Sequence, residues 1–243
     1  MIDVAFLGAD IRPAATAVVI DVLRASSTIT LALASGYERV LIAGDIDEAR
    51  ALAGPGRVLA GEVNCARAPG FDLGNSPEET LEPRAPELVL ATTNGAPAIL
   101  AAAAAADEVL VAALLNFAAV CERLAGADDV LLVCAGTDGR VSIEDVYLAG
   151  RLSVALDGPR TDAAQIAESV ARAYPSARDA LEASAGAVGL RREGLESDLA
   201  FCAQESIVEV VPRLSESKDR IAVLTAAESG RPTAVGPGRT ATS

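Results

Sequence analysis

The fold is decided by the stretch AVVIDVLRASSTITLALA, residues 17–34, in which an apolar run, a polar turn and a helix-forming segment follow one another. The apolar run predicts a buried strand at Ala17–Asp21, and the second half predicts a helix at Ser26–Ala34. Short runs of Val, Ile and Leu alternate with Ala-rich segments in the same way along most of the chain. This alternation predicts a three-layer α/β/α fold, with helices on both faces of a mostly parallel or mixed sheet.

The same patterns predict the remaining elements. We expect further strands at Ile2–Leu7, Arg39–Ala43, Val58–Ala60, Leu88–Ala91, Val109–Ala112, Val130–Cys134, Ile207–Val211 and Ile221–Leu224. We expect further helices at Asp47–Ala53, Ala96–Ala106, Phe117–Ala125, Ile143–Leu156, Asp162–Ala173 and Ala177–Ser184, and another helix start at Ser76-Pro77-Glu78-Glu79. Residues 1–225 are expected to form a single domain. Residues 226–243, rich in Gly, Pro, Thr and Ser, are expected to form a flexible C-terminal tail.

The composition excludes several kinds of function. The 243 residues include 20 Lys and Arg, 34 Asp and Glu, and no histidine, which excludes a Ser-His-Asp triad and a zinc site with imidazole ligands. Lys218 is the only lysine, so the chain has neither a P-loop nor a central Schiff-base lysine. A net charge of −14 and 3% aromatic residues argue against a nucleic-acid partner. No apolar run approaches about 20 residues and no signal peptide begins the sequence, so we expect no membrane partner and a cytoplasmic location.

Polar residues follow the expected carboxyl ends of five strands. In an open α/β sheet this edge is where ligands bind, because loops and helix N-termini meet there. The residues are Asp21 and Arg24, then Gly61 and Glu62, then Thr92, Thr93, Asn94 and Gly95, then Asn116, and finally Thr137, Glu144 and Asp145.

These residues predict two components of one site. A Mg²⁺ ion would take its oxygen ligands from Asp21, Glu62 and Asp145, with Glu144 as a further candidate. A small anionic ligand such as a phosphate or sulfonate would take its donors from the other group, namely Arg24, Ser26, Ser27, Thr92, Thr93, Asn94 and Asn116. Structural roles stay open at this point, since Asp21, Asp145 and residues 92–95 can cap helices and Arg24 can pair with Asp21 or Glu62.

Four blocks of the sequence, in order, resemble the 2-phosphosulfolactate phosphatase (ComB) family. They are DVLRASSTI at 21–29, GFDLGNSP at 70–77, TTNG at 92–95, and CAG at 134–136 with SIED at 142–145. The resemblance extends through Ser197–Cys202 and Val210–Pro212, and so covers about residues 1 to 213. Two positions depart from the family pattern. Val63 follows Gly61 and Glu62 where members often carry arginine, and Gly186 stands where a more polar patch is expected.

The resemblance implies a Mg²⁺-dependent hydrolase that converts 2-phospho-3-sulfolactate to 3-sulfolactate and phosphate on a route to coenzyme M. A similar small phosphorylated 2-hydroxy acid stays open as the substrate. It also implies substrate-binding roles for Asn75, Ser76 and Gly95, which lie in the matching blocks. On this hypothesis, Asp21 and Glu62 hold the metal, and Arg24 and Asn94 bind phosphate oxygens. Asp145 orients a water or binds the metal through water, and the attacking group is a water or a carboxylate.

Three alternatives remain at the level of sequence. Cys134 and Arg140 have the C-x5-R spacing of cysteine-dependent phosphatases, in which a thiolate attacks phosphorus. Asp45-Ile46-Asp47 resembles the start of a haloacid-dehalogenase-type site, but such chemistry needs a downstream lysine near acidic residues and Lys218 comes too late, so a plain helix start is favoured. The third alternative is a non-catalytic homologue that binds anions. We also expect the protein to form a homodimer.

Overall fold

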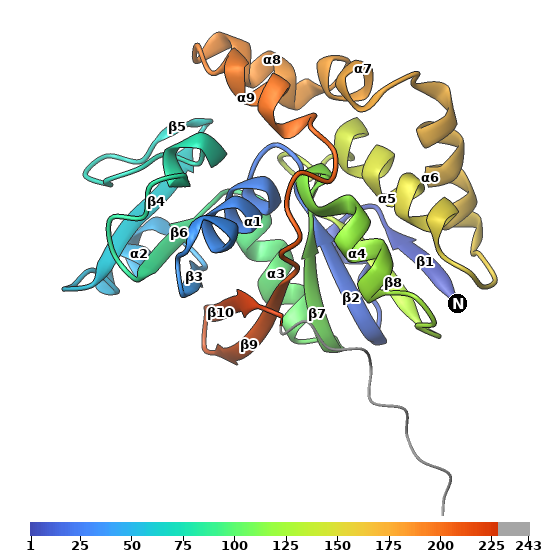
Figure 1. Cartoon of the computed structure of the whole chain (residues 1–243), viewed down its shortest axis with the longest axis horizontal. Coiled ribbons are helices and arrows are strands. Elements are labelled where there is room, and N and C mark those ends of the chain that lie inside the picture. Colours follow the sequence, from blue (N-terminus) through green and yellow to red (C-terminus); the bar gives the residue numbers. More distant parts are fainter. Residues whose placement is uncertain (228–243) are drawn as a thin grey trace, which may run out of the picture.

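The computed structural model describes residues 1–227, which form the expected three-layer α/β fold around one mixed sheet of ten strands (Figure 1). The strands are β1 (Ile2–Ala5), β2 (Ala14–Ile20), β3 (Arg39–Ala43), β4 (Arg57–Val63), β5 (Ala66–Arg67), β6 (Glu87–Ala91), β7 (Ala106–Ala112), β8 (Val130–Cys134), β9 (Pro212–Lys218) and β10 (Ile221–Ala226). Their order across the sheet is β1-β8-β2-β7-β9-β10-β3-β6-β4-β5. The sequence predicts a tail at residues 226–243; of this range, residues 228–243 lie outside the described residues.

The helices cover the two faces of this sheet. They are α1 (Ala25–Ser35), α2 (Ile46–Ala51), α3 (Gly95–Ala103), α4 (Phe117–Arg123), α5 (Ile143–Ala155), α6 (Asp162–Ala173), α7 (Ala177–Glu182), α8 (Ala185–Arg192) and α9 (Glu196–Cys202). Three 3-10 turns, η1 (Gly8–Asp10), η2 (Pro77–Thr80) and η3 (Leu114–Asn116), complete the set. No helix in the described part of the chain is long and apolar enough to cross a membrane.

Strand β2 shows why the sheet carries helices on both faces. Successive side chains of a strand point to opposite faces, so all of them can be apolar only where both faces are covered. Val18 and Ile20 belong to one buried cluster with side chains of α5 and α6. Ala17 and Val19 belong to another with side chains of α1 and α3. The apolar run that opens the β2–α1 unit is therefore buried on both faces of the sheet.

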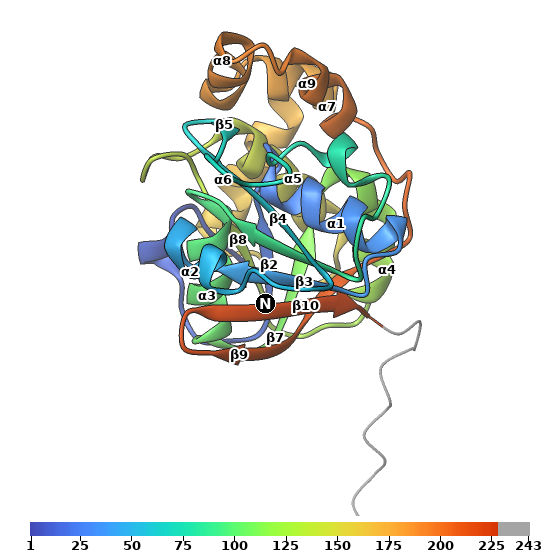
Figure 2. The same cartoon turned by 90° about the vertical axis from the view of Figure 1, so that its left-hand side faces the viewer.

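The sheet consists of two parallel groups joined by the C-terminal hairpin. Strands β1, β8, β2 and β7 are parallel neighbours, and so are β3, β6 and β4. The β9–β10 hairpin lies between β7 and β3, and its pairings are antiparallel. Strand β9 pairs with β7 at a single position, Leu110 with Arg213, whereas β10 pairs with β3 over four. Figure 2 shows this hairpin crossing the lower part of the molecule, beside β3.

Several predicted boundaries were wrong. The helix expected to run to Ala106 ends at Ala103, because Ala106 already pairs with Ala14 as the first residue of β7. Residues 207–211 do not form the expected strand. Val208 donates a backbone hydrogen bond to Leu115 in an irregular segment, and the strand lies at Pro212–Lys218 instead.

Other differences concern short elements. The helix expected after Ser76 is only the 3-10 turn η2, and the helices α8 and α9 and the strand β5 were not predicted.

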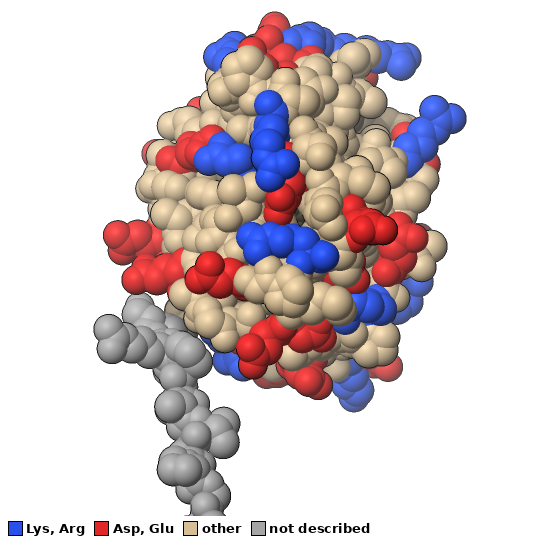
Figure 3. Space-filling view, turned by 90° about the vertical axis from the view of Figure 1, so that its right-hand side faces the viewer, with Lys and Arg blue, Asp and Glu red and all other residues tan. Residues whose placement is uncertain are grey.

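On the face of the molecule that Figure 3 shows, basic and acidic side chains are interspersed, and no continuous basic patch covers it.

Candidate active site

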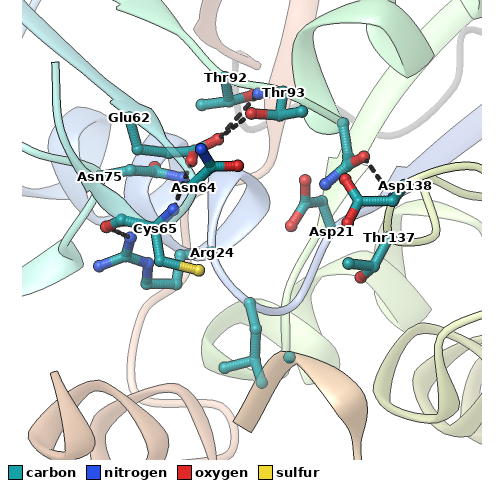
Figure 4. Close-up of a pocket in the computed structure, with 13 residues that line it drawn as sticks. Asp21, Arg24, Glu62, Asn64, Cys65, Asn75, Thr92, Thr93, Thr137 and Asp138 are labelled. Carbon is teal, nitrogen blue, oxygen red and sulfur yellow. Dashed lines mark hydrogen bonds between the residues drawn. The ribbon is translucent and has the colours of Figure 1, made fainter. Parts of the chain in front are cut away.

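A polar pocket lies where the carboxyl ends of β2, β4 and β6 come together (Figure 4). Its other walls come from the β4–β5 turn, the loop after β8 and the start of α8. The lining residues are Asp21, Leu23, Arg24, Glu62, Asn64, Cys65, Asn75, Thr92, Thr93, Asn94, Thr137, Asp138 and Gly186. The charged members are one arginine and three carboxylates. Most of the polar residues that were predicted to follow strand ends therefore line this pocket.

Asp21 follows the last residue of β2 and is 7% exposed. Its Oδ1 accepts a hydrogen bond from the Ala25 backbone N–H at 3.2 Å, which fixes the carboxylate against the first turn of α1. Burial raises the pKa of Asp21 to about 7, and nearby Glu144 and Glu62 act in the same direction. Its Oδ2 lies where a Cβ on Gly95 would approach to 2.6 Å, so the absence of a side chain at Gly95 leaves that oxygen room.

Glu62, at the end of β4, joins two edges of the pocket. Its Oε1 accepts hydrogen bonds from the Thr93 N–H and the Thr93 hydroxyl, both at 2.8 Å. Its Oε2 accepts one from the Cys65 N–H at 2.9 Å. Asn64 and Cys65 form the two-residue turn between β4 and β5, and both have positive φ. This carboxylate thus connects the β4–β5 turn with the loop that follows β6.

Arg24 lies at the turn between β2 and α1 and is 3% exposed. Its Nη1 donates to Asp198 on α9 at 2.7 Å, and its Nη2 donates to the Cys65 carbonyl at 2.7 Å. Arg24 was expected either to bind phosphate or to pair with Asp21 or Glu62. The ion partner in the structure is Asp198, which the sequence reading did not identify.

The loops after β6 and β8 are also connected. The Asn94 Oδ1 accepts a hydrogen bond from the Asp138 N–H at 3.1 Å. Thr92 caps the following helix, since its hydroxyl accepts the Ala96 N–H at 3.0 Å. The expected cap role for Thr92 and its place in the pocket are therefore both observed, and the two roles are compatible.

Asp145 and Glu144 lie behind the pocket, at the start of α5. The Asp145 carboxylate accepts the Val22 N–H at 2.9 Å and the Gly136 N–H at 3.0 Å, so it joins the loop after β2 to the loop after β8. Burial raises the pKa of Asp145 well above its ordinary value and that of Glu144 to about 6. The Glu144 Oε2 is buried without a hydrogen-bond partner in the described structure.

Other predicted site residues lie outside the pocket lining. Ser27 donates to the Val22 carbonyl at 2.9 Å, and the Ser26 hydroxyl accepts the Asp21 N–H at 2.9 Å. Asn116 is fully buried, and its amide bonds to the backbone of Ala113, Val111 and Val210. These three side chains hold the backbone, and Ser76 bonds to Asp198 rather than pointing into the pocket.

The alternative nucleophile, Cys134, is not part of the pocket. It is the last residue of β8, it is fully buried, and burial raises the pKa of its thiol well above the ordinary value. Residues 137–140 form a tight turn in which Thr137 and Arg140 exchange backbone hydrogen bonds. A buried, protonated thiol is a poor nucleophile.

Two features of the pocket could have been found in the sequence. Asn64 favours the left-handed backbone that it adopts in the β4–β5 turn, so the turn itself was predictable. Gly186, noted above as a departure from the family pattern, lines the pocket where a Cβ would approach the Glu144 Oε1 to 2.6 Å. The other departure, Val63, is 45% exposed and does not line the pocket.

Comparison with known proteins identifies the family of this chain. The family model described as 2-phosphosulpholactate phosphatase matches residues 7–217, and so spans most of the chain. The chain belongs to this family. A relative from Thermus thermophilus, named probable 2-phosphosulfolactate phosphatase, is 40% identical over 81% of this chain and 86% of its own length. Relatives of the same name from Thermotoga petrophila and Thermotoga maritima are each 39% identical over 88% of this chain and 95% of their own length.

The blocks that carried the resemblance to the 2-phosphosulfolactate phosphatase family meet around this pocket. Residues 21–29 contribute Asp21 and Arg24, residues 70–77 contribute Asn75, and residues 92–95 contribute three lining residues. The fourth block places Asp145 behind the pocket. Within residues 1–227, no three His, Cys, Asp or Glu side chains gather into a group that could hold a metal ion.

Proposed function

We propose that this protein is a Mg²⁺-dependent phosphatase that hydrolyses 2-phospho-3-sulfolactate, or a similar small phosphorylated 2-hydroxy acid, to 3-sulfolactate and phosphate. Membership of the family and the names of its relatives support the reaction and the ester. The observation that carries the proposal is the buried Asp21 carboxylate at a strand end, beside the first turns of α1 and α3. First-turn N–H groups have no intrahelical acceptor and favour anionic ligands.

The charges of the pocket support a cation as part of the site. One arginine against three carboxylates would repel a phosphate ester that also carries a sulfonate. Asp21 and Glu62 both line the pocket, and carboxylate oxygens are the ligands that Mg²⁺ prefers. Asp21 and Glu62 would hold the ion, which would neutralise phosphate oxygens. Asp145 as a third ligand stays a prediction; its two oxygens accept backbone N–H groups, as do those of Glu62.

The residues of the chain have separate tasks in this reaction. Arg24 binds phosphate oxygens and orients the ester for in-line attack. Glu62 and Asn94 hold the surrounding loops, through the Thr93 and Asp138 hydrogen bonds respectively. In the overall reaction the oxygen of one water bonds to phosphorus, the bond from phosphorus to the ester oxygen breaks, and a proton from that water passes to the ester oxygen, which gives phosphate and 3-sulfolactate.

The test is phosphate release from 2-phospho-3-sulfolactate and from 2-phospholactate, measured with Mg²⁺ and with EDTA. We expect turnover that EDTA abolishes and added Mg²⁺ restores, with the sulfonated ester preferred. Thermal unfolding of the same protein should shift upward with Mg²⁺ concentration, because a ligand that binds only the folded state stabilises it. Full turnover in EDTA would contradict the metal dependence. Absence of turnover on both esters would favour the non-catalytic alternative.

Replacing Cys134 with alanine tests the cysteine mechanism. We expect kcat/KM to stay within about twofold of the wild-type value, because the thiol is buried outside the pocket. The variant is expected to lose some stability through the small cavity in the core. A loss of kcat/KM of a thousandfold or more in a folded variant would instead support a thiolate nucleophile.

The homodimer and the cytoplasmic location stay predictions.

A further inference from the structure

The buried ion pair between Arg24 and Asp198 connects parts of the chain that are 174 residues apart. Arg24 precedes α1, whereas Asp198 lies in the first turn of α9 (Figure 1). The Arg24 Nη1 lies 2.7 Å from the Asp198 Oδ2, and the two side chains are only 3% and 1% exposed. Such a pair is shielded from solvent, so its geometry is held far more tightly than that of a surface ion pair.

Two further hydrogen bonds extend this pair into a network. The second carboxylate oxygen of Asp198 accepts the Ser76 hydroxyl at 2.7 Å. On the other side, the Arg24 Nη2 donates to the Cys65 carbonyl at 2.7 Å, the contact drawn at the left of Figure 4. The guanidinium is thus anchored to α9 and to the β4–β5 turn, and Asp198 is itself anchored by Ser76.

The hydrogen bonds of this network occupy only part of the Arg24 guanidinium. A guanidinium carries five N–H donors in a rigid plane, and the two hydrogen bonds described above use two of them. Arg24 also lines the pocket. A donor group that is held in place before the ligand arrives loses little entropy on binding and needs no reorganisation during the reaction.

The same network settles which carboxylate Arg24 pairs with. Glu62 and Asp21 line the same pocket, and either would be a natural partner for a free arginine. Because Asp198 and the Cys65 carbonyl hold the guanidinium, neither Asp21 nor Glu62 forms an ion pair with it in the described structure. A metal held by those carboxylates and an arginine directed at the anion can then coexist.

We propose that Asp198 is a positioning residue, which holds the Arg24 guanidinium so that its remaining N–H donors face the bound anion and do not pair with the pocket carboxylates. This inference rests on the proposed function. It assigns a role in the reaction to α9, a helix that contributes no residue to the pocket lining.

A double-mutant cycle tests the proposal. Asp198→Asn, Arg24→Ala and the double variant are compared with wild type in kcat/KM for phosphate release. We expect Asp198→Asn to lose about a hundredfold, as for a group displaced by about 1 Å. We expect the double variant to be no worse than Arg24→Ala alone, because Asp198 acts through Arg24. Losses that multiply in the double variant would overturn the proposal.

Two further variants separate positioning from general stability. Glu168→Gln breaks another buried acid contact, with Ser153 and Arg160, and should lower the melting temperature while leaving kcat/KM within about twofold. Ser76→Ala removes the anchor of Asp198 and should give a smaller loss than Asp198→Asn. If Asp198→Asn does not fold, Ser76→Ala decides: unchanged kcat/KM in that variant would count against the network.

A binding measurement keeps this inference distinct from the proposed function. Inorganic phosphate is titrated into the same proteins in the presence of Mg²⁺, with heat release as the signal. Weaker phosphate binding in Asp198→Asn and Arg24→Ala, without a further loss in the double variant, would support the positioning role even if no ester were hydrolysed. Equal phosphate affinity in wild type and Asp198→Asn would refute it, whatever the turnover.

Discussion

Asp21→Asn is expected to lower kcat/KM for phosphate release by about a thousandfold and to remove the stabilisation of the protein by Mg²⁺. Asparagine keeps an oxygen that can accept the Ala25 N–H, so the first turn of α1 stays in place. It removes the negative charge at the oxygen that faces Gly95, and with it the carboxylate best placed to hold a cation. Steady-state kinetics and thermal unfolding with and without Mg²⁺ measure the two effects.

The matched control is Asp45→Asn, the same substitution after the end of another strand. Asp45 caps α2 by accepting the Asp47 and Glu48 N–H groups, and asparagine caps helices about as well. We therefore expect its activity and its response to Mg²⁺ to match wild type. An Asp21→Asn variant that still hydrolyses the ester and still responds to Mg²⁺ would show that the cation lies elsewhere.

Gly95→Ala is expected to lower kcat/KM by about a hundredfold and the free energy of unfolding by about 1–3 kcal/mol. A Cβ at this position would lie 2.4 Å from the Ala25 Cβ and 2.6 Å from the Asp21 Oδ2. Both distances are far inside van der Waals contact, so α1 and α3 must separate or the Asp21 carboxylate must move. Either change displaces the group on which the proposed chemistry depends. Denaturant unfolding and kinetics measure the two losses.

Gly54→Ala serves as the control for this substitution. No atom lies within 4 Å of a Cβ placed on Gly54, and its backbone does not require glycine. We expect both stability and kcat/KM to stay close to wild type. Full activity in Gly95→Ala would show that the Asp21 carboxylate has more freedom than the close approach of the two helices implies.

The parts of the fold that were predictable are those with long apolar runs. Buried strands such as β2 and β8 are almost wholly Val, Leu, Ile and Ala, so composition alone identifies them. Strand β9 is PRLSESK, largely exposed and polar, and it forms because β10 supplies its hydrogen-bonding partner. The apolar residues just before it predicted a strand that does not exist, since strand pairing depends on residues far away in the sequence.

The candidate site was predictable to a similar degree. Strand ends identified Asp21, Glu62 and Asn94, because polar residues directly after buried strands converge at one edge. Asn116 also follows a strand end, but its side-chain amide forms hydrogen bonds with backbone groups. The sequence does not show which polar side chains will bind the backbone in this way. Asp198 could not be paired with Arg24 in advance, since their contact depends on how α9 packs over the pocket.

The C-terminal hairpin sets the order in which a growing chain can complete this protein. Asp21 belongs to the group of strands around β2, whereas Glu62 and Thr93 belong to the group around β4 and β6, and β9 and β10 lie between the two groups. A nascent chain can form each group early, from contacts between neighbouring β-α units. The spacing across the pocket becomes final only when residues 212–226 have been synthesised and inserted. Folding of this family member should therefore end, rather than begin, with its most central strands.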